Sequence, residues 1–224
     1  MRERTQVSGT TRERIVSTAL RLFAEKGFAA VGIREIASEV GLSSATLYHY
    51  MGSKDDLLHE IMTDRLGRLI SVTRQALTGL GRPEDKLVTV VRVHVLVHAL
   101  HSDSVVDHQI RDLDPKARTA VIALRDSYEA IWRSLLAEGT AQPAVFRIGS
   151  PKLTRLALLE MCNGVARWYA RSGEFSPGDI ADYYADLALA IVAARRRGRT
   201  IRLEATAGPP VSELLPLVNE AYPP

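Results

Sequence analysis

Two short helical patterns, separated by only three residues, constrain the fold of this chain more than any other feature of its sequence. Apolar residues recur at helical spacing over residues 33–40, and the pattern stops at Gly41. Ser43 is a good N-cap for the second pattern, which ends near His49 or Tyr50, because its hydroxyl can accept a hydrogen bond from an unpaired backbone N–H. Two short helices joined by so tight a turn predict a helix-turn-helix.

The second of these helices carries the side chains that a helix in the DNA major groove needs. Base edges there present donors, acceptors and the thymine methyl group, so short polar groups and methyls can read them. Ser44, Ala45 and Thr46 supply such groups, and we predict that they face base edges. Ser43 and Arg34, which lies on the preceding helix, are also predicted DNA contacts.

Side chains that can hold the DNA backbone follow directly. A phenol, an imidazole and an ammonium each donate a hydrogen bond to phosphate without specifying a base. Tyr48, His49 and Lys54 are therefore the predicted phosphate contacts. Lys54 also lies at the start of the next helix, where free N–H groups and the helix dipole favour an anion. We expect Tyr50 to face the first helix and to be mainly structural.

Total charge does not by itself indicate a nucleic-acid partner. The net charge is +3 and the pI is about 9.1, yet residues 1–60 contain eight basic and eight acidic side chains. The DNA-binding prediction therefore depends on where the charges lie. The arginine cluster over residues 195–199 we interpret as a solvated helix end. Four arginines predict an N-terminal arm on the DNA backbone or in the minor groove: Arg2, Arg4, Arg12 and Arg14.

The rest of the chain also reads as helices, so we expect an all-α fold of about nine helices. One pattern covers residues 11–26, and a longer one starts after Ser53 and runs towards Leu77. Prolines stand at or before most of the later helix starts, where the missing N–H costs little. These later helices are expected over residues 84–101, 103–112, 115–138, 150–171 and 176–196.

The helical patterns and the composition divide the chain into four parts. We expect a flexible arm over residues 1–9, a three-helix DNA-binding head over residues 10–55, and a ligand-binding and dimerisation body over residues 56–196. Residues 197–224 are rich in proline, so a poorly ordered tail is expected there, although a short helix near residues 211–221 is conceivable.

Cysteine usage and hydropathy indicate the compartment. The single Cys162 cannot form a disulfide within the chain, which fits a reducing, cytoplasmic setting. The first ten residues contain no apolar run of the kind that directs export, and no later segment approaches the ~18 consecutive apolar residues of a membrane span. We expect a cytoplasmic protein without a membrane partner.

The stretch GFAAVGIREIASEVGLSSATLYHYMGSKDDLL, residues 27–58, resembles the DNA-binding head of the tetracycline-repressor (TetR) family. Gly32 and Met51 depart from the family pattern, which commonly has Ser or Thr and Phe there. The resemblance implies an all-α homodimeric repressor of a double-stranded DNA operator, with a variable ligand-binding body and no cofactor. It also implies backbone contacts at Tyr48, His49 and Lys54, and base contacts at Ser44, Ala45 and Thr46.

A second, weaker resemblance concerns the body. Residues 153–189 contain Asn-Gly, Arg-Trp-Tyr, Ser-Pro and Ile-Ala-Asp-Tyr elements in the order found in TetR-family repressors of lipid and steroid catabolism, several of which respond to acyl-CoA thioesters. An acyl-CoA effector is therefore our hypothesis. The resemblance implies a ligand set of Tyr128, Trp132, Asn163, Arg167 and Trp168.

Four of these residues have alternative interpretations. Arg167 could neutralise a CoA phosphate, and Trp168 could stack on the adenine or line the acyl path. Equally, Arg167 could pair with Glu160 or with an acid across the dimer, and Trp168 could be packing. Tyr128 and Trp132 could likewise belong to the core rather than to a pocket wall.

Other functions are less well supported by the sequence. His94, His98 and His101 share a helical face and could hold a metal, but a mixed, solvated face explains them too, and we expect no metal site. An all-α enzyme is an alternative for which no phosphate loop, nucleophile elbow or paired-histidine zinc signature is present. A constitutive or architectural DNA-binding protein is a closer alternative.

Overall fold

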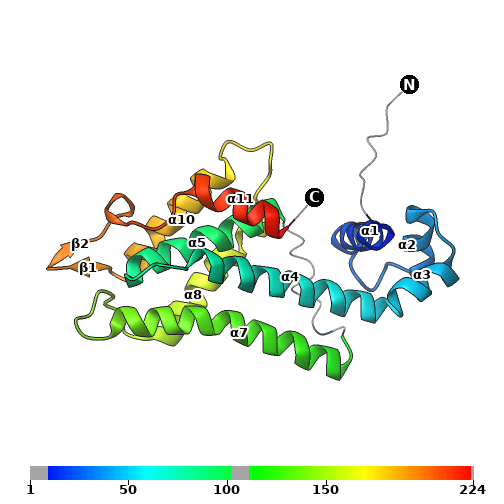
Figure 1. The fold of residues 1–224 in the computed structure, drawn as a ribbon, viewed down its shortest axis with the longest axis horizontal. Coiled ribbons are helices and arrows are strands. Elements are labelled where there is room, and N and C mark those ends of the chain that lie inside the picture. The colour runs from blue at the N-terminus through cyan, green and yellow to red at the C-terminus, as the bar shows by residue number, and fades with distance from the viewer. Residues whose placement is uncertain (1–9, 102–110, 112, 223–224) are drawn as a thin grey trace. The chain divides into compact units, whose positions relative to one another are not determined.

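The structure is a computed structural model that describes residues 10–101, 111 and 113–222. Its elements carry the labels of Figure 1. Every element of regular secondary structure in the described residues is a helix apart from one two-stranded hairpin, so the predicted all-α fold is confirmed. None of the described helices is long and apolar enough to cross a membrane. The arm over residues 1–9 and most of the helix expected over residues 103–112 lie outside the described residues.

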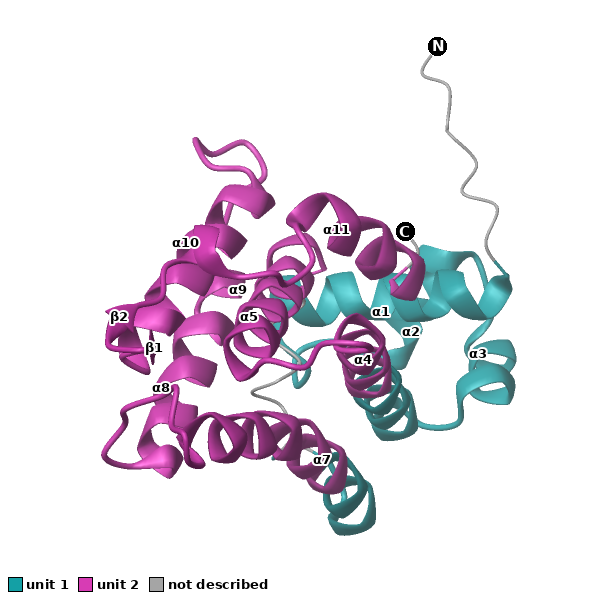
Figure 2. Cartoon of the chain, turned by 60° about the vertical axis from the view of Figure 1, so that its left-hand side comes forward, with its two compact units in different colours: residues 1–64, 105–121 teal, residues 65–104, 122–224 magenta. Residues whose placement is uncertain are grey.

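The chain divides into two compact units, drawn in different colours in Figure 2. Unit 1 comprises residues 1–64 and 105–121, and unit 2 comprises residues 65–104 and 122–224. Two long helices contribute to both units, α4 (Lys54–Ala76) and α7 (Pro115–Thr140). The boundary of the predicted head at residue 55 thus falls inside unit 1, about two helical turns before the end of that unit's first segment.

Unit 1 contains the helices that the sequence places in the head, namely α1 (Thr11–Lys26), α2 (Ile33–Val40), α3 (Ser44–Met51) and the first turns of α4. Each helix buries its apolar stripe, as helical spacing predicts. Met51 is buried and fills core space. The other buried side chains of these helices include Ile15, Leu22, Phe23, Ile36, Val40, Leu47, Leu57, Leu58 and Ile61.

Unit 2 is built around α5 (Pro83–Leu100), which is buried along almost its whole length. A helix that is apolar on nearly every side must be covered by neighbours. Here α10 (Pro177–Ile191) packs most extensively against it, and α8 (Pro151–Asn163), α9 (Val165–Trp168) and α11 (Val211–Ala221) complete the cover. The core of unit 2 therefore surrounds a single central helix.

Two of the predicted helices are shorter than expected. The helix expected over residues 150–171 breaks at Gly164 into α8 and α9, and its last turn ends at Trp168. Glycine is a poor helix former, and a Cβ at Gly164 would lie only 3.3 Å from the carbonyl oxygens of Glu160 and Met161. The helix expected over residues 176–196 ends at Ile191, because the chain turns at residue 193 into the hairpin.

The expectation of a poorly ordered tail is wrong over residues 197–222. The hairpin joins β1 (Arg195–Arg196) to β2 (Arg199–Thr200), and a 3-10 turn, η2 (Leu203–Ala205), leads to α11. Leu214 and Val218 of α11 are completely buried. The apolar residues of this segment fall at helical spacing and cover α5, so burial outweighs the high proline content.

Polar contacts also tie the tail to α5. The Ala207 backbone N–H donates to Asp85 Oδ1 over 2.8 Å. The guanidinium of Arg92 donates to the Pro209 carbonyl over 2.9 Å and to Asp182 over 2.7 Å. These contacts satisfy charged groups that α5 would otherwise bury alone.

The sequence interpretation placed the arginine cluster at a solvated helix end. In the structure the cluster lies on the hairpin instead. Arg197 and Gly198 form its turn with φ of 48° and 80°, the positive values that a two-residue hairpin turn needs. Arg196 forms an ion pair with Glu84, a buried carboxylate of α5. One member of the cluster is therefore a counter-ion for the core of unit 2.

Candidate DNA-binding and effector-binding sites

The turn between α2 and α3 has the conformation that its sequence predicts. Gly41 adopts the left-handed region at φ 73°, ψ 32°, where glycine is favoured over residues with a Cβ. Ser43 Oγ accepts from the Thr46 backbone N–H over 3.1 Å and so caps α3. Both helix ends are satisfied locally, and α3 is thereby fixed against α2 as the second helix of a helix-turn-helix.

Most of the predicted DNA contacts lie on the exposed side of unit 1. The exposed residues are Arg34, Ser43, Ala45, Tyr48 and His49, and the half-buried ones are Ser44 and Thr46. Leu47, by contrast, points into the core. No acidic residue occurs within α3, so its exposed face repels no phosphate. This arrangement suits DNA binding, and the individual contacts stay predictions.

Tyr50 differs from its expected place. It is 46% exposed and meets the His49 ring edge to face at 6.2 Å, so it is not a ring buried in the core of unit 1. Residues 46, 49 and 50 share one helical face at i, i+3 and i+4, which is the signal that identifies Tyr50 as part of the DNA-facing surface. Tyr50 is therefore a candidate contact that the sequence interpretation missed.

Lys54 has a structural role in addition to its predicted phosphate contact. Its ammonium donates to the carbonyls of Phe28 and Val31 over 2.9 Å and 3.0 Å, and lies 4.2 Å from the centre of the Phe28 ring. An ammonium has three hydrogens, so one remains for an anion. Lys54 thus joins the first turn of α4 to the loop between α1 and α2.

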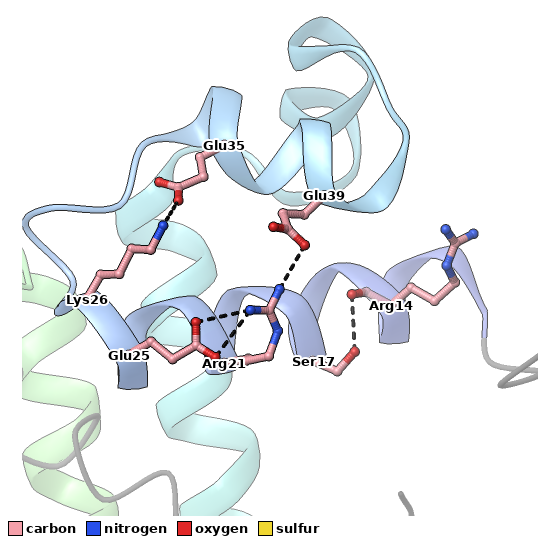
Figure 3. A network of polar contacts seen from close by, with 7 residues as sticks. All are labelled: Arg14, Ser17, Arg21, Glu25, Lys26, Glu35 and Glu39. Carbon is pink, nitrogen blue, oxygen red and sulfur yellow. Dashed lines mark hydrogen bonds and ion pairs between the residues drawn. The ribbon is translucent and has the colours of Figure 1, made fainter. Parts of the chain in front are cut away.

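Ion pairs on the surface connect α1 to α2 (Figure 3). Arg21 bridges Glu25 and Glu39 over 3.1 Å and 2.8 Å, and Lys26 pairs with Glu35 over 2.5 Å. The hydrogen bond between the last two raises the pKa of Lys26 and lowers the pKa of Glu35. Exposed pairs of this kind each contribute little, but the two that join the helices, Arg21–Glu39 and Lys26–Glu35, oppose separation of α1 from α2.

Two arginines assigned to the N-terminal arm are engaged within unit 1. Arg14 donates to the Val40 carbonyl at the end of α2 over 2.9 Å, and Arg12 pairs with Glu60 over 2.7 Å. Both belong to α1 and not to an arm. Arg2 and Arg4, the other two members of the predicted arm, lie outside the described residues.

A buried polar cluster in unit 2 brings together three of the five predicted ligand residues. His94 of α5 is 2% exposed, its Nδ1 lies 2.8 Å from the Tyr128 hydroxyl, and its Nε2 lies 2.9 Å from Asn163 Oδ1. The His94 ring meets the Trp132 ring edge on at 5.9 Å. Residues from α5, α7 and α8 therefore meet at one histidine.

The contacts of His94 fix its protonation. An amide oxygen only accepts, so His94 Nε2 carries the hydrogen that it donates to Asn163. Burial, and then the neighbouring His98, hold the pKa of His94 well below its usual value, so the ring is neutral and its Nδ1 accepts from the Tyr128 hydroxyl. The three side chains form one connected chain of hydrogen bonds.

Two further polar groups beside these hydrogen-bonded side chains lack hydrogen-bond partners. Burial raises the pKa of Tyr128 far above its usual value, and the Trp132 N–H and the Thr73 hydroxyl lie near enough to the Tyr128 hydroxyl to oppose that rise, although neither meets the geometry of a hydrogen bond to it. Both of these residues are completely buried, yet within the described residues neither Trp132 Nε1 nor Thr73 Oγ1 has a hydrogen-bond partner. An unpaired polar atom inside a core is costly, and it marks a place where a water or ligand oxygen would be stabilised.

The other two predicted ligand residues lie elsewhere. Arg167 is exposed and forms no ion pair with Glu160 within the described residues, and Trp168 is 52% exposed. The Trp168 ring lies 6.5 Å from the ring of Tyr184 on α10. Other large apolar side chains are exposed on α8, on α10 and just before α10, namely Leu153, Leu156, Phe175, Tyr183 and Ile191.

The sequence interpretation placed His94 on a mixed, solvated helix face, with a metal site as the alternative, and its burial contradicts the solvated face. No group of three or more His, Cys, Asp or Glu side chains in the described part of the chain is arranged to hold a metal. His98 stacks on His94 at 4.2 Å, but its own Nδ1 contacts the His94 carbonyl. The signal for a buried role was the position of His94 within the apolar run VVRVHVLV of α5.

An open groove of about 510 Å³ lies on another side of α7. The end of α4, the start of α5 and the middle of α7 form its walls, and we call it the α4–α7 groove. Its lining residues are Arg74, Leu77, Thr78, Leu80, Lys86, Ser127, Ala130, Ile131, Ser134, Leu135 and Glu138. The sequence interpretation contained no candidate in this groove.

Two protein-family models match the chain. The family described as "Bacterial regulatory proteins, tetR family" matches residues 15–61, which contain α2 and α3. The family described as "Tetracyclin repressor-like, C-terminal domain" matches residues 80–192, which contain His94, Tyr128 and Asn163. The two matches correspond to the helix-turn-helix and to most of unit 2.

Individual proteins of this kind are similar over most of their length. The HTH-type transcriptional repressor KstR2 of Rhodococcus jostii is 25% identical over 181 residues, 80% of this chain and 89% of that protein. The structure of the TetR-family regulator PfmR from Thermus thermophilus has a TM-score of 0.72 at 33% identity, covering 82% of this chain and all of the other. AibR, solved in complex with isovaleryl coenzyme A and operator DNA, has a TM-score of 0.71 at 20% identity, with 80% and 97% covered.

Proposed function

The chain belongs to the tetracycline-repressor family of transcriptional regulators, and from this membership we propose that it binds a near-palindromic operator as a homodimer and is released by a small-molecule effector. The observation that carries the DNA-binding part is the exposed, carboxylate-free face of α3 behind a capped turn. Two such helices in a dimer read half-sites about 34 Å apart. No cofactor is needed, and the protein acts in the cytoplasm, where its DNA target lies.

The homodimer proposal is supported by the exposed apolar surface of α8 and α10. Leu153 and Tyr183 are each 66% exposed, and Trp168 is 52% exposed. A surface of large apolar side chains on one unit is typical of a subunit interface. In this proposal Trp168 packs against the partner subunit and does not line the effector site.

The effector site is proposed at the buried polar cluster. Trp132 Nε1 and Thr73 Oγ1 offer hydrogen-bond donors without partners inside an apolar core, which suits a molecule with a long apolar part and one carbonyl. An acyl-CoA thioester has that chemistry. The AibR structure, solved in complex with isovaleryl coenzyme A, supports this class by analogy.

Binding of the effector would favour the conformation of the dimer that no longer fits both half-sites. A ligand shifts such an equilibrium only by as much as it prefers one state over the other. The buried donors supply that preference, because their partners are missing until the ligand is bound.

The test uses duplexes selected from a random pool by the purified protein. Fluorescence anisotropy should show operator binding at nanomolar to tens of nanomolar protein, and an acyl-CoA of suitable chain length should weaken it at least tenfold. Trp132→Phe keeps the ring and removes the N–H, so it should blunt the response to acyl-CoA and leave operator affinity unchanged. Operator binding that no ligand alters would instead identify a constitutive DNA-binding protein.

A further inference from the structure

The α4–α7 groove has the size and the mixed character of a small-molecule site. Its volume of about 510 Å³ falls within the range of roughly 300–1,000 Å³ that drug-sized ligands occupy. Leu77, Ile131 and Leu135 give it an apolar floor, and all three pack against the core of unit 2. Hydroxyls and charged groups stand on its rim.

The charges on the rim leave one cation without a counter-ion. Lys86 of α5 donates to both carboxylate oxygens of Glu138 at 2.8 Å, so its charge is neutralised. Arg74 of α4 is exposed and, within the described residues, its guanidinium has no hydrogen-bond or ion-pair partner. A guanidinium presents a planar set of donors that matches a phosphate or a carboxylate.

The groove shares its helices with the buried polar cluster. On α4, Thr73 faces the core and the next residue, Arg74, faces the groove. On α7, Trp132 faces the core and the preceding residue, Ile131, faces the groove. The unpaired buried donors thus lie on two of the helices that line the groove, and Thr73 directly precedes the free cation Arg74.

We infer that the α4–α7 groove binds the charged end of an amphipathic acyl anion, with Arg74 as its counter-ion. The negative group is either a phosphate of a coenzyme A thioester or the carboxylate of a free acid, and the apolar floor accepts the part that follows it. This inference rests on the proposed function, because the ligand class that it names is the effector class proposed above. It replaces the sequence expectation that Arg167 neutralises the phosphate.

The test compares two single-charge variants of the full-length protein. Arg74→Gln and Arg167→Gln each remove one exposed guanidinium from unit 2 and keep the length of the side chain. Affinity for lauroyl-CoA and for laurate is measured by isothermal titration calorimetry. Loss of a charge-assisted hydrogen bond predicts about tenfold weaker binding of the anion by Arg74→Gln, and a change of less than twofold by Arg167→Gln.

Controls separate loss of the site from loss of the fold. Arg74→Lys keeps the positive charge and should recover part of the affinity, and thermal unfolding should be the same for all variants, since Arg74 is exposed. Weakening of both probes identifies a general anion site, whereas weakening of lauroyl-CoA alone identifies the phosphate. Equal affinity of Arg74→Gln and wild type, or a larger loss in Arg167→Gln, would overturn the inference.

Failure of the inference and failure of the proposed function give different results. If lauroyl-CoA releases operator from wild type and Arg74→Gln equally well, the repressor proposal stands and the groove is not its anion site. If wild type binds neither probe, the anionic ligand class is wrong in both proposals. Operator binding, measured on the same preparation without ligand, still reports on the regulator itself.

Discussion

Leu214 of α11 is completely buried against the core of unit 2, although it lies in a segment whose composition predicts weak order. Replacing it with alanine removes three carbon atoms from the core. At about 0.8 kcal/mol per carbon the lost transfer free energy is about 2.4 kcal/mol. The cavity that remains raises the expected loss of unfolding free energy to roughly 3–5 kcal/mol.

Leu215→Ala is the matched control, because its side chain is only partly buried on the same helix. It should cost about 1 kcal/mol or less. Urea unfolding followed by circular dichroism measures both variants. A loss below about 0.5 kcal/mol for Leu214→Ala, with an unchanged dependence on urea, would show that α11 does not pack on α5 in solution, and the account of the tail would be refuted.

Three further predictions concern other parts of the chain. Gly139→Ala should lower the unfolding free energy by about 1–3 kcal/mol, because its Cβ would lie 1.9 Å from the buried Phe146 ring, and thermal unfolding would measure this. Tyr48→Phe should weaken operator binding without changing stability, as shown by anisotropy and thermal unfolding of the same sample; equal affinity would exclude the phosphate contact. Burial holds the pKa of His94 well below its usual value and the pKa of His101 at about 4, so the unfolded chain binds more protons below pH 6.5. Unfolding free energy should therefore fall as pH is lowered from 7.5 to 5, by at most about 1.4 kcal/mol per pH unit for each histidine and by less for half-exposed His101. Urea titrations at several pH values check this sign, and a flat profile would contradict it.

The helix-turn-helix could be predicted from sequence because its signals are local. Gly41 needs the left-handed conformation and Ser43 caps the next helix within three residues. Such signals act within one or two helical turns, where sequence distance and spatial distance agree. Tyr50 was interpreted as structural because of its residue type. Its position beside His49 on the exposed face of α3 is the better guide.

The body could be predicted only in part, because its site depends on distant residues. His94 meets Tyr128 and Asn163, which lie 34 and 69 positions away. No local pattern indicates that three helices bring them together. Arg167 and Trp168 follow the break at Gly164, which the pattern of one helix over residues 150–171 does not indicate, and their predicted role as ligand contacts stays a prediction.

The tail shows the limit of composition as a guide. Prolines and small residues over 197–224 resemble those of a disordered segment, but α11 retains an apolar stripe that ends in buried Val218 and Tyr222. Whether such a stripe is used depends on whether a partner surface exists. Here the other helices of unit 2 leave one side of α5 uncovered, and α11 packs on that side.

The ion pairs between α1 and α2 affect how operator binding should be measured. Arg21, Lys26 and their carboxylate partners are exposed, so added salt screens them over a distance of about 8 Å at physiological ionic strength. The same salt displaces the protein from DNA by reducing the gain from counterion release. A titration with salt thus loosens the head and weakens its phosphate contacts at once. The number of phosphate contacts is usually obtained by dividing the slope of log affinity against log salt by the slope for one contact, and here that division would overcount the contacts. Measuring Arg21→Gln and Lys26→Gln variants beside the wild type separates the two effects.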